Sequence, residues 1–278
     1  MCQAVGTLGL PDMGVYIHGH SDVVLRAHRS RTAANSASHL LPLLKPGMSL
    51  LDVGCGEGWI TRDLARLVAP GRVIGIDASA DVVERARTGG DLPDNLSFEV
   101  ADLYNLDYSD GSFDVVHIHQ VLHHLSDPVG ALKALARVTR PGGLISDREG
   151  DYGAAWWYPS SAGWETWQRA FIGVGRAEGE DLTIGRQLMR VAREAGLQDF
   201  TVSATVWTYP GFEPSAEVAS SWAERLTAAR FVQLAEAAGV GDKGTLERAA
   251  RDIRAWAENP DAFFAHPHGE IIIRVPGH

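Results

Sequence analysis

The sequence is poor in cysteine and contains no long run of apolar residues. Only two of its 278 residues are cysteines, Cys2 and Cys55, so we expect no disulfide framework. Every apolar stretch is shorter than the roughly 18 residues that a membrane-spanning helix needs, and we expect no membrane association. The first residues also lack the basic segment and apolar run of a secretory signal. These absences predict a soluble, cytoplasmic protein.

Positive charge is scarce as well. The chain has 25 Lys and Arg against 35 Asp and Glu, a formal net charge of -10 at pH 7. A broad nucleic-acid-binding face needs clustered positive charge, so we expect no nucleic-acid partner. A hydrophobic content of 45% and a charged content of 22% are typical of a globular protein. The length suits one large α/β domain with additions, or two small domains.

The most informative stretch is Leu50–Gly58, which reads LLDVGCGEG. Its apolar residues predict a short buried strand, its three alternating glycines a sharp turn, and the residues after Gly58 a helix. A second apolar strand, 73–77, ends in Asp77, 23 residues after Gly54. An acid at about that spacing accepts the hydroxyls of a nucleotide ribose in open α/β sheets. The alternative is an ordinary tight turn between a strand and a helix.

The turn does not fit a dinucleotide fingerprint. That motif needs a small residue at position 59, where this chain has Trp59. The glycine turn preceded by Asp52 instead resembles the first motif of class I S-adenosylmethionine-dependent methyltransferases. In that family the turn lies along the amino-acid half of the cofactor, which carries no phosphate. Glu57 agrees with this interpretation, because a carboxylate at the turn would repel a phosphate.

The resemblance extends over Leu50–Ser146, about a third of the chain. The segments DGSFDVV, HHLSDP and RPGG are similar to the ubiquinone/menaquinone-methyltransferase-like group, also called methyltransferase type 11. The resemblance implies S-adenosyl-L-methionine as the cofactor. The residues that it places around the cofactor are Gly54, Cys55, Gly56, Gly58, Asp77, Ala78, Ser79, Asp102, Leu103, His119 and Gln120, with Tyr16 and His20 from an N-terminal segment. For Asp102, which would take the adenine amine, the alternative is a strand-end Asp that caps a turn.

The implied fold is α/β, with a Rossmann-like, doubly wound, mostly parallel seven-stranded sheet. We expect an N-terminal helical lid over residues 1–45 and a methyltransferase core over 46–210. A helical cap insertion would follow over 211–260, with two helical patterns, and a last core strand over 261–278, broken by Pro267. The insertion could equally be a packing or dimer element, so a homodimer is possible. We also expect a helix over 181–195, and Ser126 as the N-cap of the helix that begins near Pro128.

Four histidines within eight residues raise the question of a metal site. A zinc site needs three or four converging ligands, which a strand end and a loop do not readily supply, so we expect no metal. Packing or bonding to water would account for His117 and His124. His119 falls at the carboxyl end of its strand, where ligands bind in such sheets. We therefore propose His119 and His123 as candidate catalytic residues, with His123 the candidate general base.

Charged and aromatic residues follow the fifth strand. We propose Arg148, Tyr152, Trp156 and Trp157 as a substrate pocket, with Arg148 orienting an acidic or carbonyl group. The alternative is a partly buried aromatic cluster with no role in binding.

These expectations together predict methyl transfer to a small, apolar or aromatic metabolite. The methyl group of the cofactor is carried by a sulfonium, so transfer is an in-line displacement in which alignment supplies much of the catalysis. The chain lacks the paired acids and amide of magnesium-dependent catechol enzymes, which predicts metal independence. The alternatives are a nicotinamide-dependent oxidoreductase, which Trp59 disfavours, and a catalytically degenerate cofactor-binding subunit.

Overall fold

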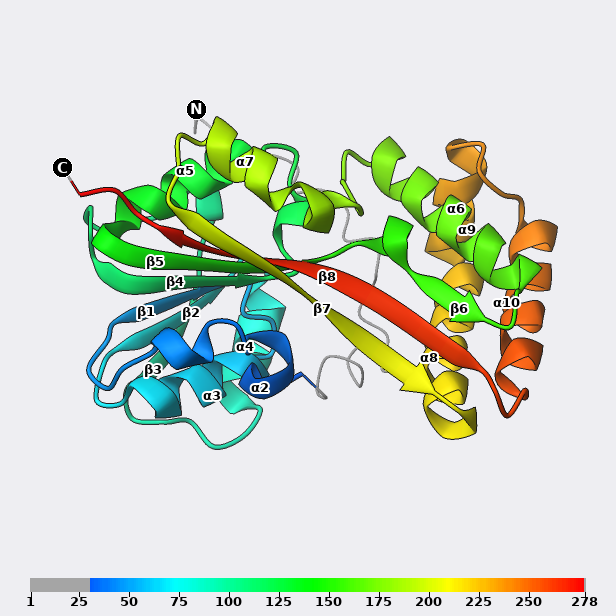
Figure 1. Ribbon diagram of the computed structural model, residues 1–278, viewed down its shortest axis with the longest axis horizontal. Helices are drawn as coiled ribbons and strands as arrows, with labels where there is room; N and C mark the ends of the chain where they lie inside the picture. Colours follow the sequence, from blue (N-terminus) through cyan, green and yellow to red (C-terminus); the bar gives the residue numbers. More distant parts are fainter. Residues whose placement is uncertain (1–30, 278) are drawn as a thin grey trace, which may run out of the picture.

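The computed structural model describes residues 31–277. Its centre is a sheet of eight strands, six of them in the order β3-β2-β1-β4-β5-β8, with β7 on the outer side of β8 and the short strand β6 also paired with β8 (Figure 1). The five parallel strands are β1 (Leu50–Val53), β2 (Val73–Asp77), β3 (Leu96–Val100), β4 (Phe113–His119) and β5 (Thr139–Gly150). The long strands β7 (Phe200–Pro210) and β8 (Phe263–Arg274) run antiparallel to each other, and β8 runs antiparallel to β5. The expected Rossmann-like, mostly parallel sheet is confirmed.

The strand count is corrected from seven to eight. The additional strand is β6 (Trp156–Tyr158), which pairs with Phe263–Ala265 at the start of β8. Pro267 does not break β8. The carbonyl of Pro267 accepts a hydrogen bond from Asp151, on the side where β5 has already ended. The ring nitrogen lies on that same side of the strand, so its missing proton removes no bond from the sheet.

Helices cover both faces of the sheet (Figure 1). On one face lie α2 (Ala33–Ser36), α3 (Trp59–Val68) and α4 (Ala80–Thr88), which share a buried core with β1, β2 and β3. On the other face lie α5 (Pro128–Val138) and α7 (Leu188–Glu194). The amphipathic pattern explains this placement, because α3 buries Ile60, Leu64 and Val68 on one side. Helices on both faces are the doubly wound arrangement that was expected.

Two local expectations need correction. The N-cap of α5 is Asp127 and not Ser126, since the Asp127 carboxylate accepts the amide of Gly130 over 2.8 Å. The helix expected over 181–195 is split into a 3₁₀ turn, Ile184–Gln187, and α7. The Asp181 carboxylate accepts from both the amide and the hydroxyl of Thr183, which holds the first residues in a turn and delays the helix.

A second core lies beyond the carboxyl ends of the parallel strands, where β7 and β8 extend out of the sheet (Figure 1). Four helices form it: α6 (Ala162–Ala177), α8 (Phe212–Thr227), α9 (Ala229–Ala237) and α10 (Lys243–Ala257). The last three lie within 211–260, one more helix than the two patterns expected there. They pack against the aromatic side chains of α6, which are Trp164, Trp167 and Phe171, and α8 adds Trp222 to this cluster. This second core is therefore built from two separate segments of the chain. None of the described helices is long and apolar enough to cross a bilayer.

Candidate active site

The glycine turn after β1 is held in left-handed backbone geometry. Gly54, Gly56 and Gly58 have φ values of +67°, +57° and +77°. A Cβ on Gly54 would lie 2.3 Å from Cγ2 of Val121, whereas a Cβ on Gly56 would meet no atom within 4 Å. The turn thus packs against the β4 loop at its first glycine and is open at its second, where a ligand can approach the backbone.

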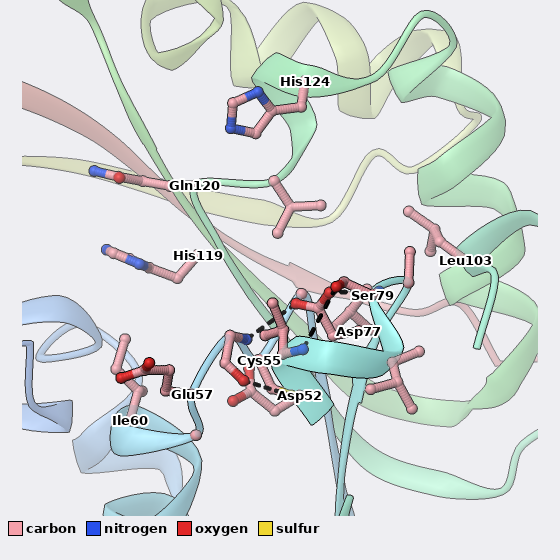
Figure 2. Close-up of a pocket in the computed structure, with 18 of the residues that line it drawn as sticks. Asp52, Cys55, Glu57, Ile60, Asp77, Ser79, Leu103, His119, Gln120 and His124 are labelled. Carbon is pink, nitrogen blue, oxygen red and sulfur yellow. Dashed lines mark hydrogen bonds between the residues drawn. The ribbon is translucent and has the colours of Figure 1, made fainter. Parts of the chain in front are cut away.

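One acid holds this turn, and a second anchors the strand that precedes it. Asp77, at the end of β2, accepts hydrogen bonds from the amides of Gly56 and Ser79 at 3.2 and 3.0 Å (Figure 2). Asp52 is buried and accepts from the hydroxyl of Thr61 at 2.5 Å, and one of its oxygens lies 2.7 Å from Nδ1 of His117. Asp77 is thereby placed at the edge of the site, while Asp52 ties β1 to α3 and β4.

A cavity of about 430 Å³ opens above the turn. Figure 2 shows His119, Gln120 and His124 on the opposite wall from Asp77 and Ser79. The predicted cofactor residues that line this cavity are Gly54, Cys55, Gly56, Gly58, Asp77, Ala78, Ser79, Leu103, His119 and Gln120. Tyr16 and His20 lie outside the described residues. Lining residues that sequence reasoning did not assign to the site are Arg31, Asp52, Val53, Glu57, Trp59, Ile60, Ile76, Val82, Arg85, Ala101, Val121, His124 and Leu125.

Asp102 is the one predicted cofactor residue in the described chain that does not line this cavity. Its carboxylate accepts from the amide of Tyr104 at 2.9 Å and from the side-chain amide of Asn105 at 2.6 Å. It therefore caps the 3₁₀ turn Leu103–Asn105, which was the alternative interpretation. The cap holds Leu103 at the cavity wall.

The four histidines of the β4 segment have distinct surroundings. Nε2 of His119 lies 3.1 Å from Nη1 of Arg148, and Nδ1 of His123 lies 2.5 Å from Oε2 of Glu149. His124 lines the cavity, and its Nδ1 lies 3.1 Å from Oε1 of Glu180. His123 is buried behind this wall and does not line the cavity. The described residues contain no group of three or more side chains arranged to hold a metal ion.

Burial governs the charge of these groups. It lowers the pKa of His119 well below its usual value, and the positive charges of Arg31 and Arg148 lower it further. Burial also lowers the pKa of His124, with a further contribution from His123. Burial raises the pKa of the Cys55 thiol, and the charges of Asp52 and Asp77 act in the same direction. His119 and His124 are therefore neutral at pH 7, and Cys55 is a thiol.

Gln120 connects the cavity wall to the far strands. It has a φ of +55°, a left-handed geometry that is uncommon outside glycine. Its side-chain oxygen accepts from Arg31 at 2.9 Å, and its nitrogen lies 2.9 Å from Nε2 of His268 on β8. The amide is thereby fixed from both ends.

The predicted substrate residues do not line this cavity. Arg148 is 1% exposed and lies behind His119. Tyr152 is buried in the second core, Trp157 stacks on Trp164, and Trp156 is half-exposed and stacks on Phe263. The three aromatic residues thus lie as in the alternative interpretation, a partly buried aromatic cluster.

Comparison with known proteins agrees with the methyltransferase resemblance of the sequence. Residues 51–146 match a family described as "Methyltransferase domain". An uncharacterized methyltransferase of Schizosaccharomyces pombe is 29% identical over 276 residues, which cover 95% of this chain and 97% of that protein. The 27-O-demethylrifamycin SV methyltransferase of Amycolatopsis mediterranei is 34% identical over 184 residues, 64% of each chain. This chain is an S-adenosylmethionine-dependent methyltransferase.

Solved structures of low identity share the fold of this methyltransferase. A putative methyltransferase from Bacillus halodurans superposes with a TM-score of 0.56 and 16% identity, over 86% of this chain and 98% of that one. A Haemonchus contortus phosphoethanolamine N-methyltransferase, solved with S-adenosylhomocysteine, has a TM-score of 0.53 and 18% identity, over 84% and 50%. The methyltransferase's cofactor is S-adenosylmethionine, and the open side of Gly56 beside Asp77 fits it, because a nucleoside can contact the bare backbone there.

Proposed function

We propose that this methyltransferase transfers a methyl group to a small apolar or aromatic metabolite by in-line displacement. The observation that carries the proposal is the cavity itself, in which the glycine turn and Asp77 face a wall containing His119, Val121 and Leu125. A cofactor on the turn would direct its sulfonium toward that mixed, largely uncharged wall.

The names of several relatives support this substrate class. One is named for 27-O-demethylrifamycin SV, one for demethylmenaquinone and one for cycloartenol. The alignments cover 64%, 40% and 75% of those proteins, and identities are 34%, 38% and 28%. All three printed substrates are apolar or aromatic molecules, so we carry over the class of substrate and none of the individual compounds.

The cofactor would be held by the residues at the carboxyl ends of β1, β2 and β3. We assign the amino-acid half to the Gly54–Gly58 turn and the ribose hydroxyls to Asp77, whose carboxylate is a hydrogen-bond acceptor. Leu103 would pack on the adenine, held at the cavity wall by the Asp102 cap that precedes it. When bound, the cofactor supplies an activated methyl group on a positively charged sulfur.

His123 is the side chain best arranged to accept a proton. The Glu149 carboxylate lies 2.5 Å from its Nδ1 and also accepts the amides of Val121 and Leu122. A carboxylate at Nδ1 keeps the proton there and leaves Nε2 as the basic nitrogen, the relation used by many histidine bases. In His119, by contrast, Nε2 already accepts from Arg148. We therefore propose His123 as the base for substrates whose nucleophile must lose a proton, which requires such a substrate to reach the Nε2 side of this buried ring.

We also propose that transfer needs no metal. The histidines nearest the cavity already have protein partners: Arg148 for His119, Glu149 for His123 and Glu180 for His124. Full activity after treatment with a chelator supports this, and recovery only on adding a divalent cation contradicts it.

Two measurements test the proposal. Calorimetry should detect binding of S-adenosylhomocysteine but not of NADH, and Asp77→Ala should remove most of the affinity. Incubation with S-adenosylmethionine and a metabolite extract should then give a mass increase of one methyl group on a specific compound. The second measurement is needed because a [4+2]-cyclase, 22% identical over 90% of this chain, shares the fold with a TM-score of 0.52. Cofactor binding with no methylated product would indicate a degenerate subunit.

A further inference from the structure

Four residues lie in register across four strands. His119 on β4 pairs with Arg148 on β5, Arg148 pairs with Glu270 on β8, and Glu270 pairs with Ser203 on β7. Their side chains are joined in the same order. The His119 to Arg148 distance is 3.1 Å, Arg148 to Glu270 is 3.3 Å, and Ser203 to Glu270 is 2.6 Å. The row leads from an outer strand to the wall of the cavity.

We propose that Arg148, held by Glu270, is a positioning residue that makes His119 a hydrogen-bond donor to an oxygen of the methyl acceptor. This inference rests on the proposed function, and it adds a requirement on the substrate. The acceptor must carry a carbonyl, phenol or ether oxygen close to the atom that is methylated.

The protonation of His119 follows from the chemistry of its partner. A guanidinium has five N–H donors and no acceptor, so Nε2 of His119 must accept the bond from Arg148. In a neutral imidazole the proton is then on Nδ1. Within residues 31–277, no group forms a hydrogen bond with Nδ1 of His119. This atom is not fully enclosed by protein, and the ring lines the cavity. The Nδ1–H group is therefore available to a ligand.

The surrounding charges keep His119 neutral. Arg31 approaches from the N-terminal side, Arg148 from β5, His117 from β4 itself and His268 from β8, and each of them lowers the pKa of His119 in addition to burial. The negative group nearby, Glu270, lies on the far side of Arg148. A ring in these surroundings donates a hydrogen bond from Nδ1 and does not act as a base.

Arg148 is itself immobilised. It is 1% exposed, its Nε donates to the hydroxyl of Thr205 at 3.1 Å, and its guanidinium lies 4.6 Å from the Trp207 ring centre. Burial lowers the pKa of Arg148 to about 10, which leaves it charged at neutral pH. Burial raises the pKa of Glu270, but hydroxyl bonds from Ser203 and Thr205 outweigh this and keep it ionised. The pair thus holds a fixed donor against Nε2.

The inference predicts how the substrate is selected. A donor that faces an oxygen gains a hydrogen bond, whereas one that faces hydrocarbon is left without a partner after losing its water. An aromatic ring with an oxygen at the right place should therefore bind better than the same ring without one.

Nuclear magnetic resonance of the full chain with ¹⁵N-labelled histidine tests the positioning step. With S-adenosylhomocysteine bound, His119 should show the neutral form with the proton on Nδ1, and His119→Gln assigns its signal. Arg148→Met should shift the ring toward the Nε2–H form, and Arg148→Lys should restore the original form because an ammonium also donates. A wild-type ring that is charged at pH 7, or protonated on Nε2, would overturn the inference even if a variant fails to fold.

Binding of 4-nitrophenol to the protein loaded with S-adenosylhomocysteine tests the substrate requirement. His119→Ala should weaken binding about fivefold, the ratio that a net hydrogen bond of about 1 kcal/mol gives. His119→Gln, which keeps an N–H donor, should change the affinity for 4-nitrophenol less than threefold. The affinity for 4-nitrotoluene should be the same in the wild type and in both variants. No binding by the wild type, or equal binding by His119→Ala, refutes the requirement. Failure of the wild type to bind S-adenosylhomocysteine would instead count against the proposed function.

Discussion

Val121 packs against Gly54 so closely that a Cβ on the glycine would lie 2.3 Å from the valine Cγ2. The contact joins the turn after β1 to the loop after β4, two segments that form opposite walls of one cavity. The left-handed φ of Gly54 and the lack of space for a Cβ are separate requirements for glycine.

These two requirements can be separated by a pair of substitutions. Gly54→Ala introduces both backbone strain and the clash, and it should lower the free energy of unfolding by about 2–4 kcal/mol. Gly56→Ala meets no atom within 4 Å, so strain alone should lower it by about 1–2 kcal/mol. Denaturant unfolding of both variants measures the difference. Equal losses would mean that Val121 moves aside without cost.

Asp77→Asn should weaken S-adenosylhomocysteine binding at least tenfold. A charged acceptor contributes about 1.5–3 kcal/mol to a hydrogen bond, and Asp77 also holds the amides of Gly56 and Ser79. The control is Asp81→Asn in the first turn of α4, an exposed acid that does not line the cavity. Calorimetry should find the control unchanged, and a similar affinity for both variants would remove Asp77 from the site.

The assignment of the base predicts a split between binding and turnover. His123→Ala and Glu149→Gln should each reduce kcat by about 10²–10⁴, the usual contribution of a positioned base, for a substrate that must lose a proton. Affinity for S-adenosylhomocysteine should change little, because neither side chain lines the cofactor cavity. Once a substrate is identified, steady-state kinetics decide the matter. Unchanged kcat in both variants would rule out His123 as the base.

Mild acid should destabilise the protein. Burial lowers the pKa of His39 to about 4 and of His266 to about 3, from 6.5. Below pH 6.5 the unfolded chain takes up these protons while the folded chain does not. Each such histidine therefore reduces the free energy of unfolding by about 1.4 kcal/mol per pH unit down to its folded pKa.

Asp147 acts with the opposite sign, because burial raises its pKa and the folded state holds the extra proton. His119 and His268, whose pKa values burial also lowers, act with the same sign as His39 and His266, so the net effect is a loss. Guanidinium unfolding at pH 7.0 and 5.5 should differ by more than about 1 kcal/mol. In His266→Asn the slope of the free energy of unfolding against pH should fall by about 1.4 kcal/mol per pH unit, the contribution of one proton. A flat profile would contradict the buried neutral histidines.

Trp164 and Trp156 should differ sharply in their contribution to stability. Trp164 is fully buried against Trp167, Trp256 and Phe264, so Trp164→Ala should cost about 3–5 kcal/mol. Trp156 is 50% exposed, and Trp156→Ala should cost about 1 kcal/mol or less. Thermal unfolding measures both. If Trp156→Ala abolishes turnover while leaving stability intact, the side chain belongs to the substrate site after all.

The local part of the site could be predicted from the sequence alone. Strand, glycine turn and helix are set by neighbouring residues, and Asp77 follows from its spacing, so ten of the predicted cofactor residues meet at one cavity. Arg31 and His124 were missed as lining residues, because Arg31 belongs to no motif and the HHLSDP segment does not reveal which of its two histidines faces the cavity. From the local sequence alone, Arg31 could equally face solvent and His124 could equally pack in the interior.

Residues far apart in the chain could not be related in this way. Arg148 and Glu270 are separated by 122 positions, and His119 and Arg148 by 29. Their contact depends on the register of β4, β5 and β8, and a shift of one residue would turn the side chains to the other face. Likewise, α6 joins α8 and α10 only because β7 and β8 extend beyond the sheet. The sequence determined the glycine turn, the position of Asp77 and the fold class, because these follow from local spacing. Which buried charges meet, as Arg148 and Glu270 do, was decided only by the pairing of strands, because pairing depends on the whole chain.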